Sequence, residues 1–125
     1  MKDNVQILIV EDEILVAMSM QMELEDSGYS VCGIAATGDK AIEMIKTIQP
    51  DIVLMDVNLS GSKNGINTAI EIRNFSNTPI IFLTGYSDKM VTDTIIGITN
   101  TSHLIKPTGI NSIQTEIDKL LSINY

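Results

Sequence analysis

The chain has 125 residues, 44% of them hydrophobic, which is enough for one domain with a single core and excludes a disordered chain. Its 16 acidic and eight basic residues give a net charge of −8, which argues against nucleic acid binding because that function needs clustered Lys or Arg. The lone cysteine, Cys32, excludes an internal disulfide or a thiolate zinc site, and no run approaches the roughly 18 apolar residues of a membrane span.

Short apolar runs alternate five times with longer helical patterns. In chain order we expect a strand at Gln6–Val10, a helix at Glu13–Ser27, a strand at Ser30–Ala35, a helix at Asp39–Ile48, a strand at Ile52–Met55, a helix at Ile66–Phe75, a strand at Ile80–Leu83, a helix at Lys89–Asn100, a strand at His103–Ile105 and a helix at about Asn111–Leu121. Most of the strand runs are continuously apolar, which is typical of strands covered on both faces. This alternation predicts a parallel sheet with right-handed crossovers and helices on both faces, that is, one doubly wound α/β domain over residues 1–125.

Two of the predicted helices have distinctive patterns. The first carries Leu15, Met18 and Met22 on one face and has Gly28 as its stop. The fourth is rich in β-branched residues, which restrict helical rotamers, so its own sequence supports it poorly. It is either free to shift or fray, or held by packing that overrides local propensity.

Acidic residues follow two of the predicted strands. Glu11 and Asp12 come directly after the first strand, and Asp56 ends the third. Parallel strands of an open sheet end at one edge, so we expect these carboxylates to share a crevice there. Like charges so close together raise a pKa or require a cation. Carboxylate oxygens with room for water suit Mg²⁺, and the backbone carbonyl of Asn58 can supply a further oxygen.

A cation and a hydroxyl follow the fifth and the fourth predicted strands. Lys106, held before Pro107, can offset the charge of Asp56 or pair with a phosphoryl oxygen. Thr84 can donate a hydrogen bond to an oxyanion, and Gly85 after it allows close backbone approach. A carboxylate nucleophile, a Mg²⁺ site, an ammonium and a hydroxyl donor are what phosphoryl transfer to an aspartate requires.

Four motifs, in this order and spacing, resemble the receiver domain of two-component response regulators. They are Val10-Glu11-Asp12-Glu13, Leu54-Met55-Asp56, Leu83-Thr84-Gly85 and Ile105-Lys106-Pro107. Each motif alone is weak, but all four at the ends of strands one, three, four and five are specific, and the resemblance spans essentially the whole chain. It implies a flavodoxin-like (βα)5 fold with a five-stranded sheet in the order 2-1-3-4-5.

The resemblance also implies roles for the acidic residues. Asp56 would accept the phosphoryl group. Asp12 and Asp56 would bind Mg²⁺ directly, together with the Asn58 carbonyl, and Glu11 would act mostly through water.

Further roles concern the phosphoryl group and the partners. Lys106 would contact the phosphoryl group, and Thr84 would hydrogen-bond it and move towards it. The donor would be a sensor histidine kinase or a histidine phosphotransfer protein docking beside the first helix, and the face of helix four, strand five and helix five would signal to a downstream protein. Such a domain is not an enzyme in the ordinary sense, because it catalyses only its own phosphorylation and dephosphorylation.

The sequence departs from the family pattern at several positions. His103 stands where a Tyr or Phe usually acts as the partner of Thr84 in switching, so it either switches, makes the coupling sensitive to pH, or is an ordinary half-exposed residue. The loop after Asp56 is one residue longer than usual, which predicts a mobile loop or tolerated length variation. Tyr86 either flanks the path of water to the phosphoryl group or is a surface aromatic, and Thr108 replaces a common Phe.

Other functions stay open at this point. A receiver-shaped adaptor that signals without phosphate is favoured by His103. A haloacid dehalogenase-type enzyme would need D-x-D-x-T after the first strand, and neither G-x-G-x-x-G nor G-x-x-x-x-G-K of nucleotide-binding folds occurs. We expect a cytoplasmic location, since the first apolar stretch is too short for a signal peptide. The chain is expected to be either a stand-alone regulator or part of a larger protein such as a hybrid kinase.

Overall fold

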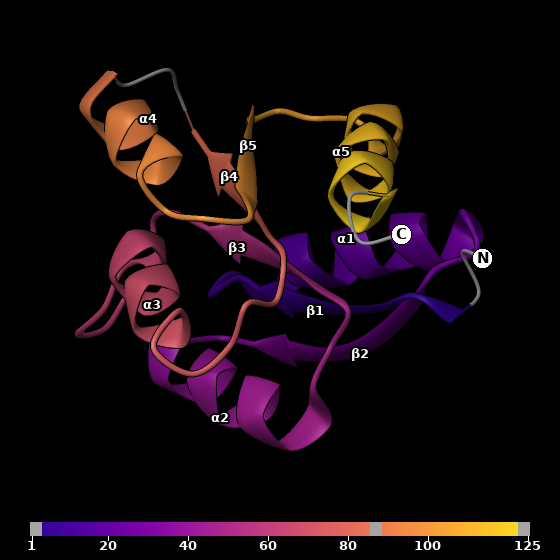
Figure 1. Ribbon diagram of the computed structural model, residues 1–125. Helices are drawn as coiled ribbons and strands as arrows, with labels where there is room; N and C mark the ends of the chain where they lie inside the picture. Colours follow the sequence, from indigo (N-terminus) through magenta and orange to yellow (C-terminus); the bar gives the residue numbers. More distant parts are fainter. Residues whose placement is uncertain (1–3, 86–88, 123–125) are drawn as a thin grey trace.

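The computed structural model describes residues 4–85 and 89–122, and within these ranges the chain forms one parallel sheet flanked by helices (Figure 1). The strands are β1 Gln6–Val10, β2 Ser30–Ala35, β3 Ile52–Asp56, β4 Ile80–Thr84 and β5 Thr101–Ile105. The helices are α1 Ile14–Asp26, α2 Gly38–Ile48, α3 Gly65–Ile72, α4 Lys89–Ile96 and α5 Ile110–Ser122. The spatial order β2-β1-β3-β4-β5 confirms the predicted flavodoxin-like α/β fold.

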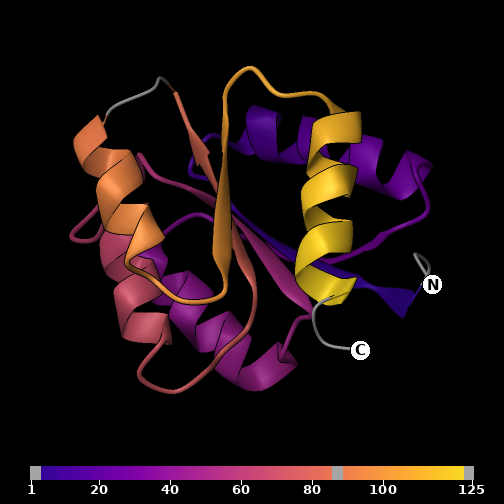
Figure 2. The ribbon, with the colours of Figure 1, turned by 45° about the horizontal axis from the view of Figure 1, so that its top comes forward.

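The helices cover both faces of the sheet. In Figure 1 and Figure 2, α1 and α5 lie on one face, while α2, α3 and α4 lie on the other. One core cluster joins the sheet to Ile45, Ile72 and Ile95 of the three-helix side. The second cluster joins it to Leu24 of α1 and Ile117 of α5. Because both faces are covered, β1, β3 and β4 are apolar almost throughout, as the continuous apolar runs predicted.

The strand register brings the carboxyl ends of the central strands to one level. Cα partners near these ends are Val10 and Met55, Asp56 and Leu83, and Thr84 and Ile105. Strands β3 and β4 run one residue further than predicted, so Asp56 and Thr84 are the last strand residues themselves. The polar residues that follow the strands therefore converge at one edge of the sheet.

Side-chain caps fix where α2 and α3 begin. The Thr37 hydroxyl accepts a hydrogen bond from the Lys40 N–H at 3.1 Å, and the Asn64 side chain accepts one from the Asn67 N–H at 2.8 Å. Such caps satisfy backbone donors that the first helical turn leaves unpaired. Gln49, with a φ of 56°, ends α2 directly before Pro50.

The apolar face of α1 that the sequence predicts points outward. Leu15, Met18 and Met22 lie on one face of the helix, but they are 79%, 50% and 65% exposed. The side packed on the sheet instead carries Ala17 and Leu24, both fully buried. Because α1 is apolar around most of its circumference, the spacing of its apolar residues does not specify which side meets the sheet.

Helix α4 is shorter than predicted. It ends at Ile96 and does not continue to Asn100, which has a φ of 56° outside the helical region. The Thr101 hydroxyl donates to the carbonyls of Ile98 at 2.9 Å and Ile95 at 3.3 Å, which are carbonyls near the helix end. A residue of β5 thus satisfies carbonyls at the end of α4, and the β-branched Ile98 and Thr99 lie beyond the helix.

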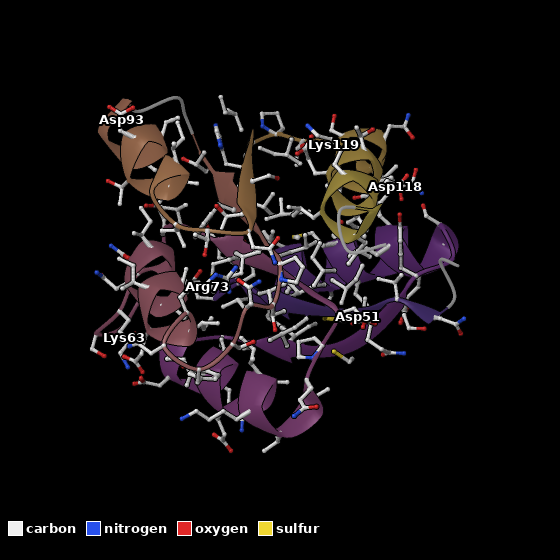
Figure 3. All side chains as sticks on the ribbon, in the orientation of Figure 1. Asp51, Lys63, Arg73, Asp93, Asp118 and Lys119 are labelled. Atoms are coloured by element: carbon white, nitrogen blue, oxygen red, sulfur yellow. The ribbon has the colours of Figure 1, made fainter. Side chains whose placement is uncertain are left out.

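Arg73, labelled in Figure 3, holds the segment between α4 and β5 from the C-terminal end of α3. Its guanidinium donates to the carbonyl oxygens of Thr99 at 2.9 Å, Asn100 at 3.1 Å and Ser76 at 3.1 Å. Three backbone carbonyls outside regular structure therefore accept hydrogen bonds from one side chain, and the Asn100 carbonyl also accepts one from the Ile80 N–H at 3.2 Å. Within the ranges the structure describes, no helix is long and apolar enough to cross a bilayer.

Candidate functional site

Three carboxylates meet where β1 and β3 end. Oxygens of Glu11, Asp12 and Asp56 all lie within 4.8 Å of one another. Glu11 is only 3% exposed and Asp56 only 4% exposed, whereas Asp12 is half-buried. β1 and β3 are adjacent parallel strands, so their ends place these acidic residues together, as the sequence predicted.

Lys106 supplies positive charge to this cluster. Its Nζ lies 3.2 Å from Oδ2 of Asp56 and 3.8 Å from Oε1 of Glu11. The backbone N–H of Lys106 donates to the Thr84 carbonyl at 2.7 Å, which ties the segment after β5 to the end of β4. The Lys106 side chain is one-third exposed, so it can also meet a group arriving from solvent.

The carboxylate of Asp56 is held at both oxygens. The Asn58 N–H donates to Oδ1 at 3.0 Å, while Oδ2 faces Lys106. The backbone of Asp56 is packed against the start of α3, where a Cβ on Gly65 would lie 2.2 Å from the Asp56 carbonyl oxygen. That position therefore requires glycine, a role that the sequence showed only as one of two glycines in a loop.

The loop after β3 is tied down. The Ser60 N–H donates to Oδ2 of Asp12 at 3.2 Å, so the loop contacts the acidic cluster directly. Lys63, labelled in Figure 3, forms ion pairs with Asp39 of α2 and, at 3.2 Å, with Glu71 of α3. These tethers favour an ordered loop over the mobile one considered above.

In the metal-free cluster, the pKa values of Glu11 and Asp12 are shifted in opposite directions. Burial raises the pKa of Glu11 to about 7, and the charge of Asp56 adds to this rise, while the Glu13 N–H, 3.1 Å from Oε2 of Glu11, opposes it. The pKa of Asp12 is lowered by hydrogen bonding to Glu11 and to Ser60. Glu11 therefore holds its proton to a higher pH than Asp12 does.

Thr84 and His103 share one face of the sheet. Thr84 is buried at the end of β4, and His103 is half-buried on β5 opposite Phe82, which belongs to the core under α2, α3 and α4. Alternate residues of a strand point to the same face, so both lie on the α4 side. Tyr86 falls outside the described residues.

Comparison with known proteins assigns the fold to a family. Residues 7–118 match the family described as the response regulator receiver domain. The chain belongs to this family. The transcriptional regulatory protein PdtaR of Mycobacterium tuberculosis (strain ATCC 25618 / H37Rv) is 32% identical over 117 residues, covering 94% of this chain and 57% of PdtaR. The receiver therefore spans just over half the length of that relative.

Two solved receiver structures resemble the chain over almost its whole length. The signal receiver domain of a modulated diguanylate cyclase from Desulfovibrio desulfuricans G20 has a TM-score of 0.85 and 31% identity, covering 94% of this chain and 93% of that one. The N-terminal domain of a response regulator/sensory box/GGDEF protein from Carboxydothermus hydrogenoformans has a TM-score of 0.84 and 31% identity, covering 95% of each chain. The predicted family is thereby confirmed.

Sequence reasoning missed several features of the receiver. The backbone N–H groups of Ser60 and Asn58 orient two of the carboxylates, and no side-chain motif announces such contacts. The sequence shows that α1 has an apolar face, but it does not show that this face is exposed. A cavity between α1 and α5 carries no sequence signal, because its walls come from both ends of the chain.

Proposed function

We propose that this receiver is a phosphorylation switch in two-component phosphorelay signalling, with Asp56 as the phosphoacceptor. The donor would be a sensor histidine kinase or a histidine phosphotransfer protein, and the output a downstream protein target. One observation carries the proposal: the Lys106 ammonium lies 3.2 Å from a buried Asp56 carboxylate that is itself part of a three-carboxylate cluster. The arrangement places a nucleophile beside a cation at the carboxyl edge of the sheet, where a partner protein would approach.

The donor set fits Mg²⁺. Glu11, Asp12 and Asp56 offer closely spaced carboxylate oxygens, and Asn58, whose N–H already bonds Asp56, follows close enough to offer its carbonyl. Burial and the charge of Asp56 raise the pKa of Glu11, because they disfavour its ionised form. A divalent cation would stabilise that ionised form. When bound, Mg²⁺ supplies positive charge that offsets the carboxylates and the phosphoryl oxygens.

The residues of the chain account for the transfer itself. An Asp56 oxygen attacks phosphorus, the new O–P bond forms as the N–P bond of the donor phosphohistidine breaks, and the electron pair returns to the imidazole nitrogen. Lys106 is placed to pair with a phosphoryl oxygen once Asp56 carries the group. Thr84, at the neighbouring strand end, is proposed to donate its hydroxyl to a second oxygen.

The output face follows from where Thr84 lies. Thr84 and His103 share the α4 side of the sheet, and Thr101 of β5 bonds the end of α4. A movement of Thr84 towards the phosphoryl group would therefore open space next to His103 and beneath α4. We propose that phosphorylation shifts the equilibrium of the α4-β5-α5 face in this way.

The donor is proposed to dock beside α1. Ile14, Leu15, Met18 and Met22 form an exposed apolar strip on this helix, with Ile14 59% and Leu15 79% exposed. An apolar strip of this kind on a monomer surface commonly marks a protein contact. The test uses any phosphohistidine protein that labels the wild type. Leu15→Glu should reduce phosphoryl transfer from it strongly, whereas Ile70→Glu, at an exposed position of α3, should not.

Labelling of Asp56 tests the central proposal. The protein is incubated with Mg²⁺ and acetyl phosphate, and its intact mass is measured; the wild type should gain one phosphoryl group and Asp56→Asn should not. Asp51→Asn is the matched control, because Asp51 precedes the same strand, as Figure 3 shows, and bonds the Gln6 N–H at 2.7 Å. Equal labelling of the wild type and Asp56→Asn would refute Asp56 as the acceptor.

The same experiment separates the adaptor alternative, which rests on His103 in the switch position. A phosphate-independent adaptor would show neither Asp56 labelling nor a response to beryllofluoride. His103→Tyr is expected to leave labelling intact and to change only the affinity of the phosphorylated protein for its partner. Loss of labelling in that variant would place His103 in the reacting site.

A further inference from the structure

The loop between β3 and α3 meets the acidic cluster with an exposed tip. The Gly65 N–H donates to the Val57 carbonyl at 2.9 Å and so closes the base of the loop. At the tip, Gly61 has a φ of 100°, and a Cβ built there would meet no atom within 4 Å. Ser60 beside it is exposed, yet its N–H donates to Oδ2 of Asp12 at 3.2 Å. This contact therefore depends on what holds the loop on each side of the tip.

Different residues hold the two sides of the tip. On the β3 side, Leu59 is buried in the core under α2, α3 and α4. On the α3 side, Lys63 forms ion pairs with Asp39 of α2 and, at 3.2 Å, with Glu71 of α3 (Figure 3). The stem of Lys63 also lies close to α2, since a Cβ built on Gly38 would be 3.2 Å from the Lys63 Cβ. Lys63 thus connects the loop to two helices at once.

The ion pairs of Lys63 join segments that are distant in the sequence. Exposed ion pairs within one helix contribute little, and the pair of Lys40 and Glu43, 3.5 Å apart, constrains α2 alone. The Lys63 side chain is instead only 27% exposed, and it holds a loop against two helices. The conformational freedom of the tip is therefore lost when the protein folds, and not when a ligand binds.

We propose that Lys63 is a positioning residue for the Mg²⁺ site of the three-carboxylate cluster, a role that rests on the function proposed above. By fixing the far side of the tip, Lys63 keeps the Ser60 N–H on Asp12. Asp12 is then oriented before the cation arrives, so that less loop and side-chain freedom is lost on binding. Lys63 acts through the loop, because Asp39 and Glu71 engage its ammonium.

Amide exchange and Mg²⁺ binding of Lys63→Met test the proposal by NMR. In EDTA the Ser60 amide should exchange with water about fivefold faster than in the wild type, and titration with magnesium chloride should show about fivefold weaker binding, as the loss of a well-placed ion pair implies. Lys63→Arg should restore both values, since a guanidinium can pair with the same carboxylates. Lys40→Met removes an equal charge within α2 and should neither speed Ser60 exchange nor weaken Mg²⁺ binding.

Removing the partners of Lys63 separates positioning from a general effect of charge. In a background of Asp39→Asn and Glu71→Gln, Lys63→Met should cause no further loss of Mg²⁺ affinity, because its ion pairs are already gone. Labelling of Asp56 by acetyl phosphate should need about fivefold more Mg²⁺ in Lys63→Met and reach the wild-type rate once Mg²⁺ saturates.

Several results would overturn the proposal. They are an unchanged Mg²⁺ affinity in Lys63→Met, an equal loss of affinity in Lys40→Met, and a loss that persists in the background without the two acidic partners. Absence of Mg²⁺ binding to the wild type would refute the metal site and the role of Lys63 together. Mg²⁺ binding without labelling of Asp56 would refute the phosphoacceptor function alone, because the affinities of the variants still decide the role of Lys63.

Discussion

Replacing Glu11 with Gln removes one charge from the acidic cluster while keeping the shape of the side chain. The pKa of Glu11 rises from its ordinary value of 4.5 to about 7 in the fold, mainly through burial and also through the charge of Asp56. A difference of about 2.5 pH units, at about 1.36 kcal/mol per unit, corresponds to about 3 kcal/mol. Ionised Glu11 therefore lowers the free energy of unfolding of the metal-free protein by about that amount.

The sign of the pH dependence follows from proton binding. Between pH 4.5 and pH 7 the folded state binds a proton at Glu11 that the unfolded state has released, so this group makes the free energy of unfolding fall as pH rises. A Gln resembles the protonated Glu and does not titrate. Glu11→Gln should therefore match the wild type near pH 4.5 and exceed its free energy of unfolding by up to about 3 kcal/mol above pH 7.

Urea unfolding in EDTA, measured at intervals from pH 4.5 to 8.5, checks this expectation. Glu25→Gln, at the exposed C-terminal part of α1, is the matched control and should differ little from the wild type at any pH. A difference between Glu11→Gln and the wild type that stays constant over the whole range would contradict the raised pKa. A Glu11→Gln variant less stable than the wild type at pH 8 would show that the pairing with Lys106 outweighs the repulsion and burial.

Four further outcomes are expected in denaturation experiments. Gly65→Ala should lower the free energy of unfolding by about 2 kcal/mol or more, because its Cβ would lie 2.2 Å from a backbone oxygen, whereas Gly109→Ala should be nearly neutral. Arg73→Met should cost about 3 kcal/mol, since three carbonyl oxygens lose their charged donor. Ser102→Ala should stabilise by about 1 kcal/mol, because the buried Ser102 hydroxyl has no hydrogen-bond partner among the described residues. Millimolar Mg²⁺ should raise the melting temperature of the wild type, and raise it less in Asp12→Asn; an equal rise in both would count against the cluster as the binding site.

The parts of the fold that the sequence predicted well depend on local patterns and a strong global constraint. Short apolar runs, most of them continuous, marked all five strands, and parallel pairing then required their carboxyl ends to share an edge. The meeting of Glu11, Asp12 and Asp56, and the approach of Lys106, follow from that constraint alone. Errors of one or two residues at the strand ends did not affect it, because the polar residues lie at the strand ends or directly after them whichever residue ends the strand.

The parts that the sequence did not predict depend on contacts between distant residues. The end of α4 is set by the Thr101 hydroxyl and by Arg73 from another helix, neither of which a local pattern reveals. The buried side of α1 was ambiguous because apolar residues surround the helix, and only packing selected Ala17 and Leu24. The loop after β3 allows two interpretations from sequence, and the ion pairs of Lys63 with α2 and α3 are contacts that no local pattern reveals.

These same contacts separate a rigid part of the receiver from a part that can respond. Asp56, the proposed acceptor, ends a strand whose five residues are all buried, between two neighbouring strands, with its carboxylate held at both oxygens. β5, by contrast, is an edge strand whose residues are half-buried or exposed, and it connects to the eight-residue α4. Phosphorylation adds negative charge at the rigid end, and the Lys106 N–H bonded to the Thr84 carbonyl links that end to β4 and β5. We expect a change at Asp56 to be absorbed by β5 and α4, because the residues of β5 are half-buried or exposed and hold few buried contacts to lose.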